Sequence, residues 1–271
     1  MDTPDVVLTP VVIGVALLIG VLTGLLSGTF GVGGGIVCTP MLRLFLQLDP
    51  HDAVGTTLAL IVPTSMAGSI NYVKEKLVNF SMVKALVLPG IIGVVLGAYA
   101  TTFVHGQILM ICFSALIALA GLDLVSGYTY KLKTSSAAVA EQGHAGISWM
   151  RIFPIGLLTG LLAGFFGVGG GFILIPILLS AFNMNVKSAF GTSLLVVACL
   201  SIPGAVSHTL LDHVQIWLVL IMACGAVPGS MIGSKLALKL KDSSLRTSFG
   251  AIMLFMAAFM AYKELNILVG K

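Results

Sequence analysis

The sequence contains very few charged side chains for its length. Of its 271 residues, 14 are Lys or Arg and 10 are Asp or Glu, so charged residues make up 9% of the chain. A soluble domain carries roughly 25%. Hydrophobic residues reach 58%, and the mean hydropathy is +1.09. This composition excludes a water-soluble domain and predicts an integral membrane protein, with the lipid bilayer as its partner and no nucleic acid.

The sequence also lacks the motifs of the common hydrolases and metalloproteins. It has no HExxH, no GxSxG and no acidic pair within an apolar stretch, so we do not expect an enzyme. The four cysteines lie inside apolar runs, without CxxC spacing, and are predicted to be buried thiols. Neither a metal site nor a cofactor is expected. No basic region or cleavage site precedes the first apolar stretch, which we expect to be retained.

What the sequence does contain is a tandem repeat. The segment 20–42, GVLTGLLSGTFGVGGGIVCTPML, returns 136 positions later at 156–178 as GLLTGLLAGFFGVGGGFILIPIL, with 15 of 23 positions identical. The same offset relates Gly55-Thr56 to Gly191-Thr192. Glycine-interrupted apolar segments at matching places in two halves are typical of secondary transporters.

Apolar stretches long enough to cross a bilayer predict the helices, since about 20 residues are needed. The short runs 36–48 and 172–182, which follow the glycine motifs, are either re-entrant hairpins or halves of broken helices. We therefore expect an all-α polytopic protein with 8–10 membrane segments. The expected full-length helices are 8–28, 53–73, 82–104, 107–127, 188–210, 213–236 and 246–268, and 152–166 is a shorter counterpart of the first.

The distribution of Lys and Arg favours one arrangement, because cytoplasmic loops collect positive charge. Eight crossings divide the basic residues eight to six. If the short segments also cross and the N-terminus is outside, the division is eleven to three, with Arg43, Lys263 and Lys271 outside. An odd number of crossings in each half makes the repeats inverted. The sequence predicts repeats at 1–127 and 151–271, joined by a polar cytoplasmic linker at 128–150.

The duplicated GVGGG motif is the strongest candidate for a binding site. Successive glycines permit backbone angles that other residues avoid. A helix that starts directly after them presents free N–H groups and a partial positive charge to an anion. Elsewhere the glycines are better explained by close helix packing, as in Gly20-Gly24-Gly28 and Gly156-Gly160-Gly164.

Paired GVGGGxxxxP motifs, each followed by a GT[ST]L segment, resemble the TauE/SafE family of membrane permeases, the sulfite exporters, over essentially the whole chain. The resemblance implies transport of small sulfur-containing anions such as sulfite, thiosulfate or sulfonates. It also implies coupling to an ion or proton gradient, with H⁺ as the candidate ion. It identifies neither the substrate nor the direction of transport, and the oligomeric state is open.

Hydroxyl side chains supply a second polar layer. Thr56 and Thr57, and their counterparts Thr192 and Ser193, can donate to an oxyanion or bond back to their own helices. Their paired placement favours anion contact. We thus expect the anion to be bound by Gly33, Gly34, Gly35, Gly169, Gly170, Gly171, Thr56, Thr57, Thr192 and Ser193.

Four further residues are secondary candidates. Ser65 and Ser201 lie beside Pro63 and Pro203, where a helix can bend. Arg43 is either a selectivity element or a side chain that extends to the outer interface. His208 is either a proton carrier or an interfacial residue, and the matching position in the first half is Tyr72.

These observations predict a secondary-active anion transporter of a bacterial-type cytoplasmic membrane, working by alternating access around the paired motifs. An anion channel could use the same glycine backbone as a filter. A membrane assembly factor without transport activity is the third alternative.

Overall fold

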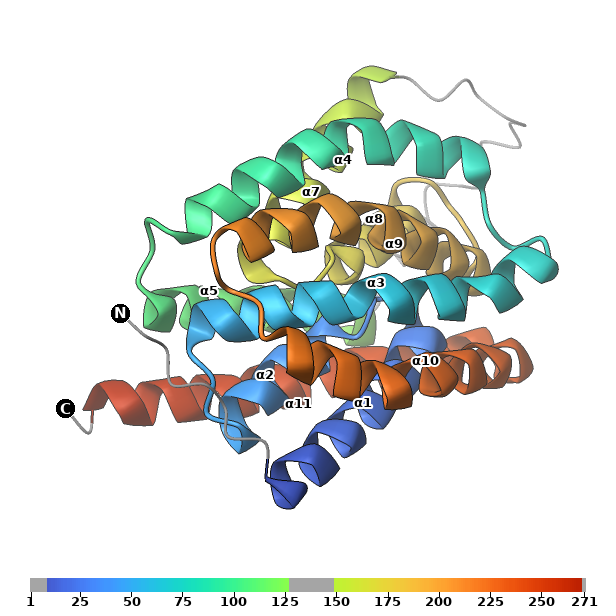
Figure 1. The fold of residues 1–271 in the computed structure, drawn as a ribbon. Coiled ribbons are helices and arrows are strands. Elements are labelled where there is room, and N and C mark those ends of the chain that lie inside the picture. Colours follow the sequence, from blue (N-terminus) through green and yellow to red (C-terminus); the bar gives the residue numbers. More distant parts are fainter. Residues whose placement is uncertain (1–8, 127–148, 270–271) are drawn as a thin grey trace.

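The computed structural model describes residues 9–126 and 149–269 as a bundle of helices (Figure 1). No strand occurs in these ranges, and ten helices are present. They are α1 (Pro10–Phe30), α2 (Gly35–Phe45), α3 (Pro50–Lys74), α4 (Phe80–Thr101), α5 (Gly106–Ser126), α7 (Trp149–Phe166), α8 (Gly171–Ser180), α9 (Val186–Leu210), α10 (Ile216–Lys239) and α11 (Asp242–Val269). The predicted all-α membrane architecture is confirmed, and most helix ends fall within a few residues of the expected ones. The linker predicted at 128–150 lies almost entirely outside the described residues.

Helix length separates two kinds of segment. Seven of the described helices are long and apolar enough to cross a membrane, whereas α2, α8 and the apolar part of α7 are shorter. With 11 residues, α2 extends about 16 Å, roughly half of the hydrocarbon core. A short helix of this kind reaches from one membrane surface only to the middle.

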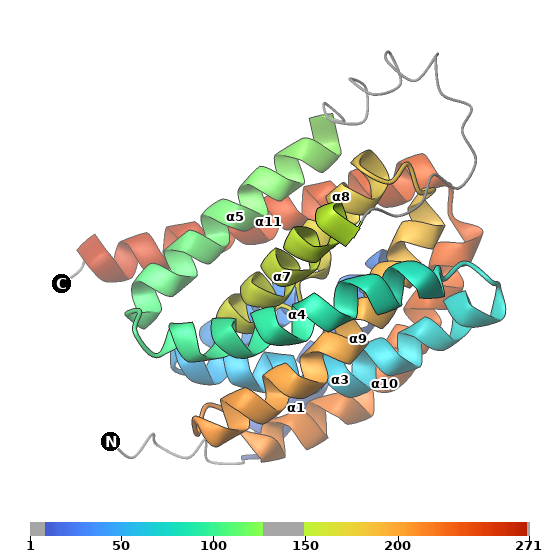
Figure 2. The same cartoon turned by 90° about the horizontal axis from the view of Figure 1, so that it is seen from above.

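The helices of the two halves pack against each other in a reciprocal pattern (Figures 1 and 2). The largest helix pairs are α1 with α10 and α4 with α7, so a helix of each half lies against the other half. Helices α3 and α9, which occupy matching places in the repeat, cross at the centre. Helices α5 and α11 form a further matching pair. Neither half therefore has a separate core of its own.

Stripes of small residues make the α1–α10 and α4–α7 contacts close. A Cβ added at Gly24 would overlap the backbone of Ala226 in α10, and a Cβ added at Gly160 would overlap the backbone of Gly90 in α4. The packing interpretation of these stripes is confirmed. Successive contacts advance in the same direction in both helices of each pair, so α1 runs parallel to α10 and α7 runs parallel to α4.

The helix directions define two ends of the bundle. The histidine end contains the start of α3, the end of α4 and the α9–α10 loop, which carries His213. The lysine end contains the α3–α4 loop, the start of α9 and the end of α10, where Lys187 donates to the Leu238 carbonyl at 2.8 Å. Helices α1 and α7 begin at opposite ends, and each described helix reverses the direction of the one before it within its half. These alternating directions agree with the ten-segment arrangement, in which α2 and α8 are segments of their own that cross part of the bilayer.

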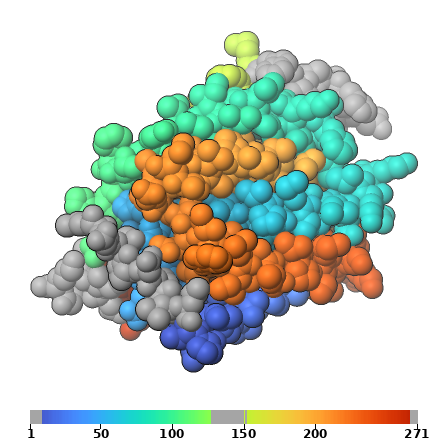
Figure 3. Space-filling model, in the orientation of Figure 1, coloured from blue at the N-terminus to red at the C-terminus, as the bar shows by residue number. Residues whose placement is uncertain are grey.

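The outward helix faces are apolar, as a lipid environment requires. On α4 the side chains of Leu88, Ile92 and Leu96 are more than half exposed and lie at one-turn spacing. Figure 3 shows this helix along the rim of one face of the molecule. The prediction of buried thiols holds for Cys38 but is wrong for Cys112 and Cys224, which lie on such outward faces.

Widening the α4–α7 contact should prevent folding. We expect Gly160→Leu to abolish the folded, monodisperse protein, because the added side chain must enter the backbone of α4. The matched control is Gly14→Leu on α1, where an added Cβ meets nothing within 4 Å. Size-exclusion profiles and thermal unfolding in detergent measure both variants. A folded Gly160→Leu protein with the stability of the Gly14→Leu control would contradict this packing.

Candidate functional site

The two GVGGG motifs adopt the same backbone conformation. The first, third and fourth positions of the motif have left-handed φ angles in both copies: Gly31 (72°), Gly33 (81°) and Gly34 (87°), then Gly167 (69°), Gly169 (72°) and Gly170 (74°). L-residues with a Cβ rarely adopt such angles, which explains glycine at these positions. Each motif ends α1 or α7 and turns the chain back into the short helix that follows.

The short helices begin without a side-chain cap. Gly34 and Gly170 are the N-cap residues of α2 and α8, and neither can supply a capping oxygen. The first N–H groups of both helices therefore have no intrahelical acceptor. Their dipoles place a partial positive charge at the glycine motifs.

The two motifs lie against each other at the middle of the bundle. An added Cβ at Gly35 would come 2.5 Å from the Val168 Cα, and one at Gly171 would come 2.8 Å from the Val32 Cα. Both motifs also contact the midpoints of α3 and α9. An added Cβ at Gly33 or Gly169 would lie 2.6 Å from Val197 Cγ1 of α9 and within 3.5 Å of Ile61 of α3.

Apolar side chains pack beside both motifs at the centre of the bundle, where Ile61 and Val197 contact them. Leu58, Ile61 and Val197 are fully buried and form a small cluster of their own. Residues of both motifs are buried as well. The structure therefore represents a closed state, in which solvent does not reach the motifs.

Buried hydroxyls without a partner surround the glycine motifs. Thr23 and Ser27 of α1 border Gly34, and Thr159 of α7 borders Gly170. Six buried hydroxyl oxygens in the described chain have no hydrogen-bond partner. Five belong to Thr23, Ser27, Ser65, Thr159 and Ser193, and the sixth to Ser230, which packs on Gly28 and Gly68. Buried polar atoms are normally paired, so this cluster suits a polar ligand.

Sequence reasoning had included Ser65 and Ser193 and missed Thr23, Ser27 and Thr159. Those three residues lie within the glycine stripes of α1 and α7, which we assigned to helix packing. The signal was present in the repeat itself, because Thr23 and Thr159 are matching positions. Thr57 is also near this region, where its hydroxyl accepts from Thr39 at 3.1 Å.

Thr56 and Thr192 have a different arrangement. The Thr56 hydroxyl accepts the backbone N–H of Gln215 at 3.0 Å, and the Thr192 hydroxyl accepts that of Asn79 at 3.0 Å. Asn79 and Gln215 are the N-cap residues of α4 and α10. Each threonine therefore ties its helix to a loop of the other half, and their contact with an anion stays a prediction.

This tie predicts a stability loss. Thr56→Val and Thr192→Val should each lower the free energy of unfolding by about 1 kcal/mol, because an N–H loses its acceptor. The control is Thr209→Val, whose exposed hydroxyl bonds only to the Ala205 carbonyl of its own helix. Denaturant or thermal unfolding measures the difference. Unchanged stability together with weakened anion binding would instead assign the two hydroxyls to the ligand.

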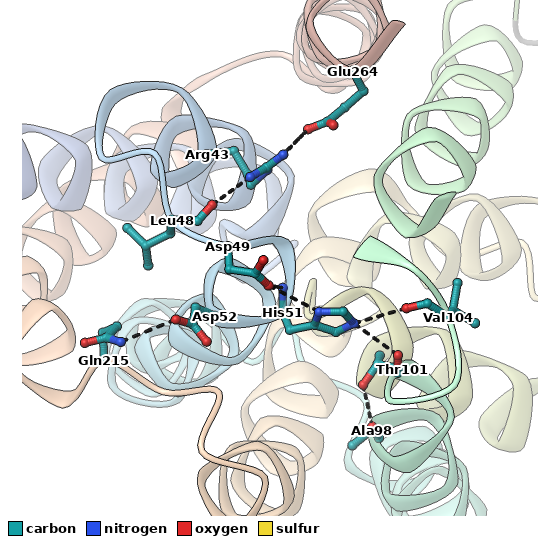
Figure 4. A network of polar contacts seen from close by, with 10 residues as sticks. All are labelled: Arg43, Leu48, Asp49, His51, Asp52, Ala98, Thr101, Val104, Gln215 and Glu264. Carbon is teal, nitrogen blue, oxygen red and sulfur yellow. Dashed lines mark hydrogen bonds and ion pairs between the residues drawn. The ribbon is translucent and has the colours of Figure 1, made fainter. Parts of the chain in front are cut away.

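Arg43 is paired and lies at the end of α2, away from the motifs. Its guanidinium contacts Glu264 of α11, with Nη2 2.8 Å from Oε1, and donates to the Leu48 carbonyl at 2.7 Å (Figure 4). The arginine side chain is 12% exposed and the glutamate 1%. Ser201, another secondary candidate, donates to the Val197 carbonyl of its own helix.

His208 and Tyr72 make equivalent contacts in the two halves. The His208 Nε2 lies 2.9 Å from the Gly164 carbonyl of α7, and the Tyr72 hydroxyl donates at 3.0 Å to the Gly28 carbonyl of α1. Each side chain thus binds the last turn of the helix before a glycine motif. His208 lies in the last turn of α9, and its ring is fully buried among protein atoms.

The histidine end carries a polar network that the sequence did not predict (Figure 4). His51 Nδ1 lies 3.2 Å from Asp49 Oδ1, and its Nε2 lies 3.1 Å from the Thr101 carbonyl and 3.2 Å from that of Val104. The hydrogen bond from His51 lowers the pKa of the Asp49 carboxyl. Asp52 also accepts from Gln215 at 3.4 Å.

Comparison with known proteins identifies the chain's relatives. The family model described as "Sulfite exporter TauE/SafE" matches residues 16–260. The chain belongs to this family. A "Probable membrane transporter protein" of Xylella fastidiosa is 30% identical, over 94% of this chain and 95% of its own length. Probable transporters of Methanocaldococcus jannaschii (29%, 90% and 93%) and Bacillus subtilis (YunE, 28%, 82% and 86%) are similar.

No solved structure matches the chain. TauE/SafE membership and the membrane-crossing helices make the chain an integral membrane protein of a transporter family, which is not an enzyme class. A bacterial cytoplasmic membrane is consistent with the relatives from X. fastidiosa and B. subtilis.

Proposed function

We propose that this TauE/SafE protein is a secondary-active transporter of a small sulfur-containing anion, such as sulfite, thiosulfate or an organosulfonate, bound between the paired GVGGG motifs. One observation carries the proposal. The uncapped starts of α2 and α8 lie together at the middle of the bundle, among hydroxyls that have no partner. The description of the family supports the sulfur oxyanion class.

The chemistry of this place suits an anion. Free N–H groups at helix starts and the helix dipoles stabilise negative charge without a cationic side chain. Thr23, Thr159 and Ser193 offer hydroxyl donors from three helices. A neutral site of this kind also releases its ligand more easily than a lysine or arginine pocket would, since no strong ion pair has to break.

Alternating access follows from the arrangement of the two halves. We infer that the repeats are inverted, because α1 and α7 begin at opposite ends and pack on α10 and α4 in reciprocal fashion. The lysine end, which carries most of the basic residues of the described chain, would then face the cytoplasm. The buried cluster of Leu58, Ile61 and Val197 beside the motifs supports a carrier over an open channel.

Thermal stability against a panel of anions tests the proposal. Purified protein is heated with sulfite, sulfate, thiosulfate, small sulfonates or carboxylates, since a ligand that binds the native state raises its stability by mass action. We expect a concentration-dependent rise with one sulfur oxyanion and none in Gly170→Val, provided that this variant is folded without ligand. No rise with any anion, in folded wild-type protein, would refute the anion site.

A further inference from the structure

Three histidine rings lie in a row at the histidine end. The ring centroids of His51 and His213 are 5.2 Å apart, and those of His213 and His208 are 5.7 Å apart. The His51 side chain is 22% exposed, whereas His208 is fully buried. The row therefore leads from the protein surface into its interior.

Hydrogen bonds fix the protons on the two outer rings of this row. Both nitrogens of His51 face acceptors only, the Asp49 carboxylate and two carbonyls, so His51 is an imidazolium. The Nε2 of His208 faces the Gly164 carbonyl and therefore carries its hydrogen, which leaves Nδ1 with a free lone pair. The Nδ1 atoms of His208 and His213 are buried without a partner within the described chain. The row thus begins at a charged ring and ends at an unoccupied proton acceptor.

The lysine end has no such row, although the repeat places matching positions there. Histidine is the side chain that ordinarily titrates near neutral pH, and none of the three matching positions is a histidine. The counterparts 136 positions away are Lys187 for His51, Leu77 for His213 and Tyr72 for His208. The row is therefore a specialisation of one end and not a product of the shared fold.

We propose that His51, His213 and His208 form a proton-binding row that loads a proton onto His208, beside the second glycine motif, and couples it to anion binding. The coupling rests on the proposed function, but the proton site does not. In the first transfer a His51 N–H leaves its acceptor and turns toward His213. Each transfer then breaks one N–H bond and forms another, directly or through a bridging water molecule. Solvent at the histidine end restores the proton of His51.

The connection to the anion site runs through α7. His208 bonds to Gly164, three residues before Gly167, where the second motif begins. Tyr72 makes the same bond to Gly28 beside the first motif, but its phenol stays neutral. A proton on His208 therefore adds positive charge near one motif only, and in a low-dielectric interior this charge attracts an anion. Because coupling is reciprocal, the anion also favours the proton.

The middle ring of the row, His213, does not hold the transferred proton. Burial, and then the charge of His51, lowers the pKa of His213, so this ring passes a proton on and does not retain it. His213 binds a proton less readily in the folded protein than in the unfolded chain, so folding favours its neutral form. The titratable and charged groups of the elements around the row are Asp49, Asp52, Asp212, Arg43, Lys263, Glu264 and His105.

A substrate-free experiment tests the proton site. Histidine ring nitrogens are followed by NMR of ¹⁵N-labelled protein in nanodiscs, between about pH 4 and 9. We expect His208 to gain a proton within this range, and its midpoint to move in His213→Gln. A His208 ring that stays neutral throughout, or a midpoint unaffected by His213→Gln, would overturn the proposal.

A second experiment tests the coupling with thiosulfate, which does not itself titrate in this range. Its affinity for the wild-type protein should rise on the order of tenfold as the pH falls through the His208 midpoint. His208→Gln, whose amide can still donate to Gly164, should bind thiosulfate with a pH-independent affinity. The matched control Tyr72→Phe should keep the wild-type pH dependence.

The outcomes separate the two proposals. A pH-independent wild-type affinity, or an unchanged pH dependence in His208→Gln, would overturn the coupling. If wild-type protein bound neither thiosulfate nor any other anion while His208 titrated as expected, the anion function would be refuted and the proton site would stand. If His208→Gln did not fold, His213→Gln would serve in its place, with the same expected loss of pH dependence.

Discussion

Valine at Gly34 or Gly170 should abolish transport while leaving insertion into the membrane intact. Both residues have left-handed φ angles, 87° and 74°, that a β-branched residue tolerates poorly. An added Cβ at Gly34 would lie 2.5 Å from Thr23 Cγ2, and one at Gly170 would lie 2.7 Å from the Thr159 carbonyl oxygen. The strain of roughly 1–3 kcal/mol must move the start of α2 or α8. The first N–H groups of that helix would then be displaced from the opposite motif.

Uptake by reconstituted vesicles, together with thermal unfolding, measures this effect. Gly14→Val is the matched control, because the same apolar side chain there meets nothing within 4 Å and should leave uptake near wild type. Gly34→Ala and Gly170→Ala, with a smaller side chain, should give intermediate loss. Wild-type uptake by a folded Gly34→Val protein would contradict the proposal that these glycines form the anion site.

Removing one partner of the Arg43–Glu264 pair should strongly lower the stability of the protein. Glu264 is almost completely buried, so Arg43→Leu leaves a carboxylate without its cation, at a cost of about 3–5 kcal/mol. The double variant Arg43→Leu/Glu264→Leu removes both charges and should regain most of that loss. Leucine is accommodated at the matching position of the second half, Leu179, which supports this choice.

A double-mutant cycle of thermal or denaturant unfolding measures the coupling between the two side chains. The expected result is strong non-additivity. Additive effects would mean that the pair does not stabilise the contact of α2 with α11. If Arg43→Leu kept wild-type stability but weakened anion binding, the arginine would belong to the anion path, as the sequence had allowed.

Local sequence patterns predicted the elements well and their partners poorly. The expected segment 188–210 corresponds to α9, and the run after the second motif corresponds to α8, because apolar length and glycine breaks are local signals. The Glu264 partner of Arg43 comes from the opposite end of the chain, and no local pattern indicates it. For the same reason the row of His51, His213 and His208 was not predicted.

The candidate site was predicted in outline. Repetition of GVGGG indicated that two helix starts would matter, and the structure brings the two motifs into contact. The roles of individual hydroxyls could not be read from spacing, since Thr56 and Thr57 are adjacent yet have different partners. Which hydroxyl faces a loop and which faces the motifs depends on the crossing of α3 with α9, a tertiary feature.

The pairing of α1 with α10 has a consequence for how the protein is made. Helix α1 ends at Phe30, and its partner begins only at Ile216. At ribosomal rates of about 5–20 residues per second, α1 waits roughly 10–40 s for that surface to be synthesised. During this interval only its smaller contacts with α2 and α3 can form, and the face that later packs on α10 stays in lipid. The absence of any charged residue from α1 makes that possible. Helix α1 is thus synthesised well before the helix that completes its packing.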